Sequence, residues 1–401
     1  KGMGELLKNY LNSEFSYSKA DTMASFMERC ADFCCENAKY SMINMHSWMF
    51  TITYNGLREH IIDNFSIDSL IHLGPHAFDE ISGEVVQCAS FVISNKSDKN
   101  ASGIYYDLIM ESDCSSKEQQ FLSIKNDCSN SKVYSNVLQS FFKQIPESPF
   151  SYWATNKYRQ IFSQNQALST THNVKKGIDT GNNERFIRFW YEPSFSRLSL
   201  TEFDRKWFTY IKGGEFRKWY GNIDLVVNWE NEGQEIKSFS GSTIRNKDFH
   251  KKEAVTWTLL ASKNGMSARS IDKNCIFDNN GSSAFPTHDK LYLLGYLNSK
   301  VANACLTIEN PTLAFQVGNI ASLPYIDAPN KSDVNSFAQG CFSISKADWD
   351  AHETSWDFQR NPLWEQQLDI ILDEMRERGV FSEDATIDDI GPFNLPELLQ
   401  P

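Results

Sequence analysis

Alternating helical and strand patterns near the N-terminus constrain the fold of this chain more than any other feature. In a helical pattern, apolar side chains recur every three or four residues, whereas a buried strand gives a short continuous apolar run. Patterns of both kinds follow one another in the order helix, strand, helix, strand, strand, at residues 18–36, 41–45, about 51–64, 68–73 and 85–94. This order predicts half of a doubly wound α/β sheet.

We expect this half sheet to be incomplete. No Gly-rich strand-to-helix turn of the kind that binds nucleotide-like cofactors occurs before residue 18. A parallel sheet of so few strands would leave an unpaired edge and an uncovered apolar face, so we infer truncation or a missing partner. Residues 103–111 are predicted to add a strand. Residues 117–143 are predicted to form a polar connector with one or two helices, the last of them docked by Val137, Leu138, Phe141 and Phe142.

Composition indicates a globular protein without membrane segments. The 401 residues are 41% apolar and 22% charged, which is enough for two or three domains. No signal peptide is recognisable, and no apolar run reaches the roughly 20 residues needed to cross a bilayer. We therefore expect a cytoplasmic location and no membrane partner. The nine cysteines lack any Cys-x-x-Cys pair, which favours reduced thiols over a metal site.

Positive charge is concentrated in the middle of the chain. The net charge is −12, yet residues 150–325 contain 22 Lys and Arg against 16 Asp and Glu, whereas residues 1–149 contain 12 against 19. Residues 326–401 are the most acidic segment, with 5 against 16. One basic module in an acidic chain suits a protein that binds DNA through that module alone.

These three segments, 1–149, 150–325 and 326–401, are also the predicted domains. The middle segment consists of short β-like runs with many aromatic residues and turns rich in Gly and Asn, which predicts a mixed α/β module. It includes a predicted strand at 225–229 and an apolar helix at 291–306. The tail contains a predicted charged helix at about 362–378 and most of the acidic excess, which is typical of a solvated face.

Residues 206–222 combine aromatic rings, cations and glycines more densely than any other stretch. Arg217 and Lys218 supply charge for phosphates, Trp219 and Tyr220 supply planes for stacking, and two adjacent glycines allow close backbone approach. The pattern predicts a surface that contacts nucleic acid. An aromatic β-hairpin whose Trp and Tyr are core residues and whose cations are merely solvated fits the pattern equally well.

Many motifs in a fixed order give the chain a family resemblance. It resembles the adenine-specific DNA methyltransferases of the BREX phage-exclusion type, which are relatives of single-chain restriction-modification enzymes. The resemblance extends over essentially the whole chain and is carried by Lys19–Asp21, Phe26–Arg29, Met45–Phe50, Leu70–Gly74, Ala77–Ile81, Gly83–Gln87, Thr180–Asn182, Lys212–Asn222, Val227–Trp229, Leu297–Lys300 and Glu353–Phe358.

The resemblance implies a protein that transfers a methyl group from S-adenosylmethionine to N6 of adenine in double-stranded DNA. In the family, the Gly-rich cofactor loop and the Asn-Pro-Pro-Tyr motif lie before the segment where this sequence begins. The chain would then hold the C-terminal part of a class I methyltransferase domain, a target-recognition domain and the start of a helical spacer. We expect it to need the missing N-terminal half, with other phage-defence subunits as further candidate partners, and to bind no S-adenosylmethionine alone.

Two residues are implied to line the pocket of a flipped adenine. The family places an aromatic residue in the loop before the last strand, where it packs on the base, and the matching residue here is Phe78. His46 follows a predicted strand, at the end where α/β sites lie. The alternatives are a loop phenylalanine tucked into the core and a hydrogen-bonded structural histidine.

The DNA interface is predicted in the basic middle segment. Its candidate residues are cations, with aromatic and amide side chains among them, at Arg185, Arg188, Lys212, Arg217, Lys218, Trp219, Tyr220, Asn222, Arg245, Asn246, Lys251 and Lys252. Three functions remain open at this point. The chain is part of the methyltransferase, a freestanding DNA-specificity subunit that lends recognition to a separate catalytic chain, or a scaffold of a defence complex.

Overall fold

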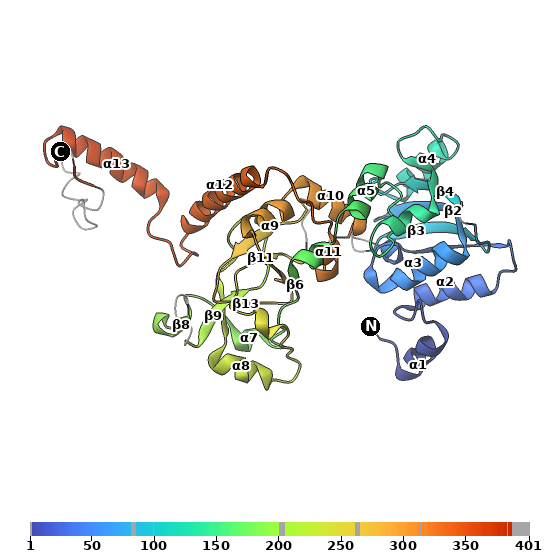
Figure 1. Ribbon diagram of the computed structural model, residues 1–401, viewed down its shortest axis with the longest axis horizontal. Helices are drawn as coiled ribbons and strands as arrows, with labels where there is room; N and C mark the ends of the chain where they lie inside the picture. The colour runs from blue at the N-terminus through green and yellow to red at the C-terminus, as the bar shows by residue number, and fades with distance from the viewer. Residues whose placement is uncertain are drawn as a thin grey trace. The chain divides into compact units, whose positions relative to one another are not determined.

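The computed structural model describes residues 2–81, 86–98, 100–199, 205–260, 265–312, 314–382 and 384–386 (Figure 1). Their contacts divide the chain into two units, which we call unit 1 and unit 2. Unit 1 contains Lys1–Val174, Leu259–Met266 and Tyr296–Pro329. Unit 2 contains Lys175–Thr258, Ser267–Gly295 and Asn330–Pro401. The predicted border at residue 149 falls inside unit 1, because Phe150 and Tyr152 belong to the core of that unit.

A five-stranded sheet with the order β1-β3-β2-β4-β5 forms the centre of unit 1. β3 pairs antiparallel with both β1 and β2, β2 pairs parallel with β4, and β5 is antiparallel to β4. β1, β2 and β4 therefore run in one direction, with the reversed β3 inserted between two of them. The strands are β1 (Lys39–Met45), β2 (Ser66–Gly74), β3 (Cys88–Ser94), β4 (Ser102–Asp107) and β5 (Val133–Leu138).

The predicted order of elements before residue 94 is confirmed. α2 (Thr22–Asp32) begins at Asp21, whose side chain accepts a hydrogen bond from the Met23 backbone N–H. Its apolar side packs in one core cluster with α3 (Asn55–Asn64) and with one face of the sheet, which contributes Leu70, Phe91 and Ile93. α1 (Glu5–Glu14) precedes them, and the 3₁₀ turns His46–Met49 and Ile52–Tyr54 connect β1 to α3.

The other face of the sheet is covered unevenly. α4 (Cys114–Ile124) packs over β2, β4 and β5 through a small cluster that includes Ile71, Tyr106 and Ile124. Over β1, which ends the sheet, Ile43 is 54% exposed and Met45 is 45% exposed. The described residues thus leave apolar side chains uncovered beside an edge strand.

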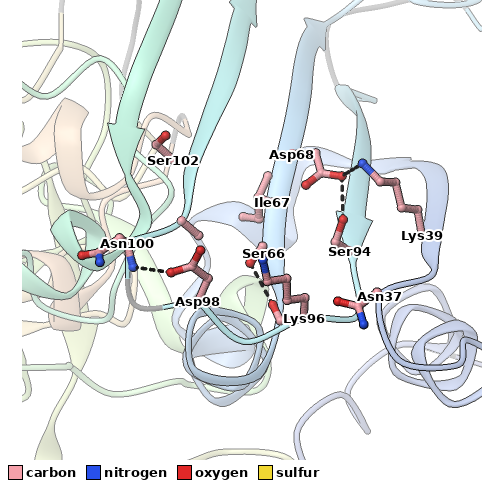
Figure 2. A pocket seen from close by; sticks show the side chains of 11 residues that line it. Asn37, Lys39, Ser66, Ile67, Asp68, Ser94, Lys96, Asp98, Asn100 and Ser102 are labelled. Carbon is pink, nitrogen blue, oxygen red and sulfur yellow. Dashed lines mark hydrogen bonds and ion pairs between the residues drawn. The ribbon is translucent and has the colours of Figure 1, made fainter.

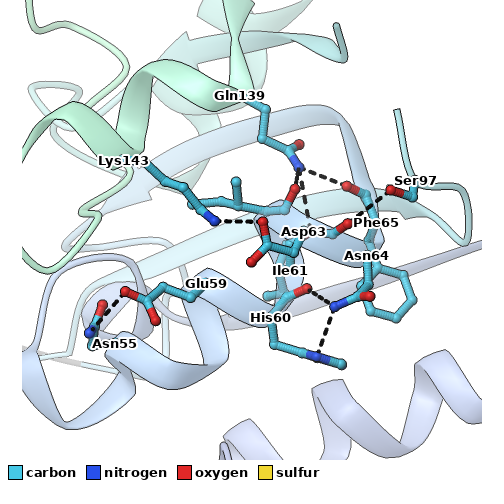
Figure 3. A network of polar contacts seen from close by, with 11 residues as sticks. Asn55, Glu59, His60, Ile61, Asp63, Asn64, Phe65, Ser97, Gln139 and Lys143 are labelled. Atoms are coloured by element: carbon cyan, nitrogen blue, oxygen red, sulfur yellow. Dashed lines mark hydrogen bonds and ion pairs between the residues drawn. The ribbon is translucent and has the colours of Figure 1, made fainter. Parts of the chain in front are cut away.

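Gln139 joins α3 to the sheet through its side-chain amide, which is buried (Figure 3). The amide oxygen accepts a hydrogen bond from the Ile67 backbone N–H at 2.9 Å, and the amide nitrogen donates to the carbonyl oxygens of Ile62 and Phe65 at 3.1 and 2.7 Å. The last turn of a helix leaves such carbonyls without partners. Gln139 therefore caps the end of α3 and fixes the start of β2 with a single side chain.

Two predicted helices take other forms. Residues 133–138 form β5, and the docking Phe142 lies in the 3₁₀ turn Gln139–Gln144 that follows it. The predicted helix 291–306 is two helices, α9 (Lys290–Leu297) and α10 (Lys300–Glu309), because the Ser299 side chain accepts a hydrogen bond from the Ala302 backbone N–H and begins a new helix. Unit 1 is completed by α5 (Asn156–Gln164), α6 (Leu168–Thr171) and α11 (Val317–Ser322).

Unit 2 is built on two small sheets. One has the order β13-β9-β10-β7, with β8 also paired to β9, and the other has the order β12-β11-β14-β6. Their strands are β6 (Asn173–Lys175), β7 (Ile187–Phe189), β8 (Leu198–Ser199), β9 (Trp207–Ile211), β10 (Leu225–Asn228), β11 (Ala254–Trp257), β12 (Ala268–Ile271), β13 (Cys275–Phe277) and β14 (Ser283–Phe285). The expected mixed α/β module is confirmed here by α7 (Asn183–Phe186) and α8 (Glu230–Lys237) among these strands.

Two longer helices end the described chain. α12 (Lys331–Asp350) packs on the core of unit 2 through Phe342 and Trp349. α13 (Pro362–Glu377) begins with Asn361 as its cap, which confirms the predicted charged helix. Among the described residues, no helix is both long enough and apolar enough to cross a membrane.

Candidate functional site

The carboxyl ends of β1, β2 and β4 lie at the same edge of the sheet, because these three strands are parallel. His46 directly follows β1, Phe78 lies in the loop after β2, and Asp107 ends β4. In α/β sheets, ligands bind at this edge. Burial raises the pKa of the Asp107 carboxyl, so this edge collects side chains in unusual electrostatic surroundings.

His46 and His72 form a buried pair at this edge. Nδ1 of His46 lies 2.8 Å from Nε2 of His72, and Nδ1 of His72 lies 3.2 Å from the hydroxyl oxygen of Tyr152. Burial lowers the pKa of His46 to about 4 and that of His72 to about 3, where the neighbouring His46 also contributes. Both rings are therefore neutral at pH 7, and one must donate its N–H to the other.

The histidine pair is enclosed by aromatic side chains. Phe50 contacts both rings, and Trp153 stacks on His72 with centroids 6.4 Å apart. This packing agrees with the alternative in which His46 is a hydrogen-bonded structural histidine. His72 was not among the candidates from sequence, because it lies inside a strand, where one histidine gives no pattern.

Phe78 lies on the surface of the loop that follows β2. It is 39% exposed and its backbone carbonyl accepts a hydrogen bond from the Ile81 N–H. Within the part of the chain that the structure describes, its ring makes no aromatic contact. The side chain is therefore accessible, as stacking on a base requires, and it is not tucked into the core.

The turn after β1 does not have the form of a loop that holds S-adenosylmethionine. Backbone N–H groups of an open Gly-rich turn would be needed to hold the cofactor. The turn after β1 is instead filled by His46, Trp48 and Met49, which are all buried. No cluster of metal-ligating side chains occurs among the described residues either.

A cavity of about 480 Å³ lies at the opposite edge of the same sheet, where β1, β2 and β4 begin (Figure 2). Its charged lining is largely satisfied internally. Asp68 pairs with the Lys39 ammonium at 2.7 Å and accepts a hydrogen bond from the Ser94 hydroxyl, while the Ser66 hydroxyl donates to the Lys96 carbonyl oxygen. These contacts join the ends of neighbouring strands.

In unit 2, residues 212–222 form a loop between β9 and β10, which we call the glycine loop. Its backbone takes left-handed conformations at several positions, including Gly214 (φ +97°) and Gly221 (φ +115°). A Cβ atom at Gly214 would lie 2.8 Å from the Asn222 side chain, and one at Gly221 would lie 2.6 Å from Arg217. Trp219 adopts φ +74° without being glycine, which is a strained conformation.

Arg269 on β12 holds the glycine loop from beneath. It is 1% exposed, and its guanidinium donates to the carbonyl oxygens of Arg217 (3.1 Å) and Gly213 (3.0 Å) and to the Thr258 hydroxyl. Burial, with the positive charge of Arg217, lowers its pKa to about 10. Asn222 adds hydrogen bonds to the carbonyl oxygens of Gly213 and Glu215. The loop is therefore rigid before any ligand binds.

Two predicted DNA-contacting residues of this loop have structural partners instead. Arg217 pairs with Asp348 on α12, donates to the Tyr220 carbonyl oxygen at 3.0 Å and lies over the Trp349 ring. Tyr220 is 6% exposed and belongs to the core of unit 2, where burial raises its pKa to about 12. Tyr220 is therefore a core residue, as the aromatic β-hairpin alternative for residues 206–222 expects. Trp219 and Lys218 are half-buried.

The other candidates are spread over unit 2. Arg185 pairs with Glu235, Lys251 pairs with Glu232, and the Arg188 guanidinium donates to backbone carbonyls near its own position. Asn246 donates to the Lys176 carbonyl oxygen. Arg245 and Lys252 are exposed, and the Lys252 ammonium lies 5.2 Å from the centroid of the Phe249 ring. These two cations form no ion pair among the described residues, whereas Arg185 and Lys251 do.

A cavity of about 570 Å³ opens beside the glycine loop. Residues of the loop, of β7 and β10 and of α12 line it together: Phe189, Lys212, Gly213, Gly214, Glu215, Asn222, Asp224, Leu225 and Trp349. Lys212 is thus a predicted cation of the loop that lines this cavity. Flat apolar walls beside charged groups are suited to a planar polar ligand.

The chain is similar to known methyltransferases and restriction-modification enzymes. Residues 1–78 match the Eco57I restriction-modification methylase family. The chain is 38% identical over 374 residues to the adenine-specific methyltransferase BrxX of Escherichia coli O9:H4 (strain HS), and 35% identical over 378 residues to PglX of Lacticaseibacillus casei (strain Zhang). These alignments cover 92% and 90% of this chain. The resemblance to BREX adenine-specific methyltransferases is therefore confirmed.

The chain spans about a third of each of these relatives, 30% and 31% of their lengths. Among solved structures it shares the fold of the type IIL restriction-modification enzyme MmeI in complex with DNA, at a TM-score of 0.55 and 14% identity, covering 97% of this chain and 54% of that one. It also matches a nuclease-deletion mutant of the type ISP enzyme LlaGI, with a DNA substrate mimic, at a TM-score of 0.50 and 9% identity over 86% of this chain and 40% of that one.

Proposed function

We propose that this relative of the BREX adenine-specific methyltransferases is part of a site-specific DNA adenine-N6 methyltransferase that uses S-adenosylmethionine. Unit 1 would contribute one wall of the flipped-base pocket, with Phe78 stacking on the adenine. Unit 2, which contains most of the predicted target-recognition segment 150–325, would bind double-stranded DNA. The remainder of the methyltransferase domain would supply the cofactor site.

One observation supports this proposal above the others: Phe78 is exposed on the loop beyond β2, at the edge of the sheet where α/β enzymes bind their ligands. A flipped base needs a flat apolar surface, and stacking on an aromatic ring contributes about 1–3 kcal/mol. The His46–His72 pair lies buried at the same edge, and both rings are neutral near pH 7 because burial lowers their pKa values.

The role of unit 2 rests on its accessible cations. Each phosphate contact by a Lys or Arg side chain releases counterions, so duplex affinity should fall with rising salt. Arg245 and Lys252 are exposed and have no carboxylate partner among the described residues. Arg217 is unsuitable for this test, because its loss would also free Asp348 and Trp349 on α12.

The experiment is a salt titration of duplex binding. Replacing Arg245 and Lys252 together by Ala should weaken binding and lower the slope of log K against log salt by up to about 0.9 for each lost phosphate contact. Lys125→Ala, an exposed lysine of unit 1, is the matched control. An unchanged affinity and slope in the double variant would contradict the DNA-binding role of this surface.

A freestanding specificity subunit is the second candidate, and the preorganised glycine loop is compatible with it. The two functions differ in what an intact parent protein does. Methyl transfer by the parent that is lost on removal of unit 1 supports the methyltransferase proposal. A chain that works only when added to a separate catalytic protein supports the specificity subunit.

A further inference from the structure

Exposed aromatic rings stand at the mouth of the cavity beside the glycine loop. Phe189 lines the cavity and stacks on Tyr191 with an interplanar angle of 4° and centroids 5.4 Å apart. The two rings are 43% and 58% exposed. Residues two apart on an extended segment share a side, and Trp190 between them points the other way, donating its indole N–H to the Thr354 carbonyl oxygen.

The position of this ring pair is fixed by the sheet. Phe189 pairs with Leu225 at the edge of the sheet, and the Trp190 backbone N–H donates to the Asp224 carbonyl oxygen at 3.0 Å. A large exposed aromatic pair on a rigid edge offers a flat surface at little cost in conformational entropy. Such a surface suits another flat ring more than a flexible chain.

The charged groups of the cavity carry a net negative charge. Lys212 provides one ammonium group, while Glu215 and Asp224 provide two carboxylates. In the described part of the chain, none of these three side chains forms an ion pair or a side-chain hydrogen bond. Two unpaired carboxylates would repel a phosphate, but they can accept hydrogen bonds from an amino group.

The walls of the cavity are held in place before a ligand arrives. The Arg269 guanidinium binds the Gly213 carbonyl oxygen, and the Asn222 amide binds the carbonyl oxygens of Gly213 and Glu215. The charged groups on either side of these glycines are therefore carried on a fixed backbone. A preorganised set of donors and acceptors favours specific recognition over general attraction.

We propose that this cavity binds a single unpaired nucleobase that carries an exocyclic amino group, as adenine, cytosine and guanine do. The base stacks on Phe189, its amino group donates to Asp224 or Glu215, and Lys212 donates to a ring nitrogen or carbonyl oxygen. This inference rests on the proposed DNA-binding function of unit 2. It adds a base site to that unit, separate from the adenine pocket assigned to unit 1.

The test compares duplexes that differ by one bulged nucleotide. The wild-type chain should bind a duplex with a bulged adenine or cytosine about tenfold more tightly than the fully paired duplex, and a bulged thymine should bring no such gain. Phe189→Ala should abolish the gain while leaving affinity for paired DNA unchanged. Asp224→Asn should reduce the difference between adenine and thymine.

Phe195→Ala is the matched control, since Phe195 is 71% exposed in unit 2 and does not line the cavity. Tyr191→Ala, at a more exposed position, gives a second variant should Phe189→Ala impair folding. Equal affinity for bulged and paired duplexes, or a gain that survives in both ring variants, would overturn the inference. Binding of paired DNA through Arg245 and Lys252 would stand in either case, so the two proposals fail separately.

Discussion

One hydrogen bond joins the buried rings of His46 and His72, with Nδ1 of the first 2.8 Å from Nε2 of the second. The sequence separates them by 26 positions, and the parallel arrangement of β1 and β2 brings them together. Because burial disfavours the charged form of each ring, the pair makes the folded state sensitive to acid.

Unit 1 should lose stability as the pH falls below about 6.5. The folded histidines titrate at about 4 and 3, whereas in the unfolded chain they bind protons from 6.5 downwards. Each should cost about 2 kcal/mol of unfolding free energy between pH 7 and pH 5. Hydrogen exchange of the β1 and β2 amides, corrected for intrinsic rates, measures this loss. The variant His72→Gln should show about half of this pH-dependent loss of stability. The control His288→Gln, at an exposed position, should show the full loss.

Phe78→Ala in the full-length parent should slow methyl transfer and preserve most duplex affinity. Stacking acts on the flipped base alone, while phosphate contacts dominate binding. Stability should change little because the ring is 39% exposed. Single-turnover methylation separates the two effects. Ile81→Ala, in the same loop and 40% exposed, is the control, and wild-type turnover in Phe78→Ala would remove this residue from the pocket.

Arg269→Lys should loosen the glycine loop even though the charge is retained. A lysine ammonium cannot reproduce the fork that contacts Arg217, Gly213 and Thr258 together. We expect a loss of about 2 kcal/mol of unit 2 stability, since hydrogen bonds to charged groups contribute about 1.5–3 kcal/mol each and lysine keeps some of them. Trypsin should then cleave faster after Lys212 and Lys218.

The matched control for the loop is Arg378→Lys, at an exposed position after α13. Mass spectrometry of the early tryptic fragments identifies the cut sites. Cleavage of Arg269→Lys at the wild-type rate would show that Asn222 and the glycine backbone hold the loop without Arg269.

Glu309→Gln should stabilise unit 1 at alkaline pH. Glu309 is 1% exposed and burial raises its pKa to about 8, although Ser322 and Asn319 donate hydrogen bonds to it. The folded protein keeps this proton up to about pH 8, while the unfolded chain releases it near 4.5. Below pH 4.5, Glu309 is protonated in both the folded and the unfolded chain and does not destabilise the fold. As the pH rises above 4.5, the free energy of unfolding falls, by about 2 kcal/mol between pH 6 and pH 8. Thermal unfolding of the variant should show a flatter pH profile than wild type, with exposed Glu14→Gln as control.

Elements with local signals were predictable from sequence. α2 has a side-chain cap at Asp21, α13 has a cap at Asn361 followed by proline, and β2 contains the apolar residues Leu70, Ile71 and Leu73. Each signal lies within a few residues of the element it specifies. The direction of β3 was not predictable in this way, because an apolar run does not tell which neighbour a strand pairs with.

The roles of single side chains in the glycine loop depended on distant partners. Arg217 looks like a DNA-contacting cation in sequence, yet its carboxylate partner, Asp348, is 131 positions away on α12. Arg269, which organises the loop, lies on another strand and carried no local signal. The sequence predicts a helix docked by Val137, Leu138, Phe141 and Phe142, but pairing with β4 places Val137 and Leu138 in strand β5.

The Gln139 cap joins residues that are far apart in the chain and are therefore synthesised at different times. The hydrogen-bond partners of its amide group, Phe65 and Ile67, precede it in the chain by 74 and 72 residues and are synthesised first. At synthesis speeds of roughly 5–20 residues per second, they would wait about 4–15 s on the ribosome for residue 139. During that interval the end of α3 has no cap and β4 has no β5 beside it, so the nascent half sheet is the stage at which a chaperone would be needed most.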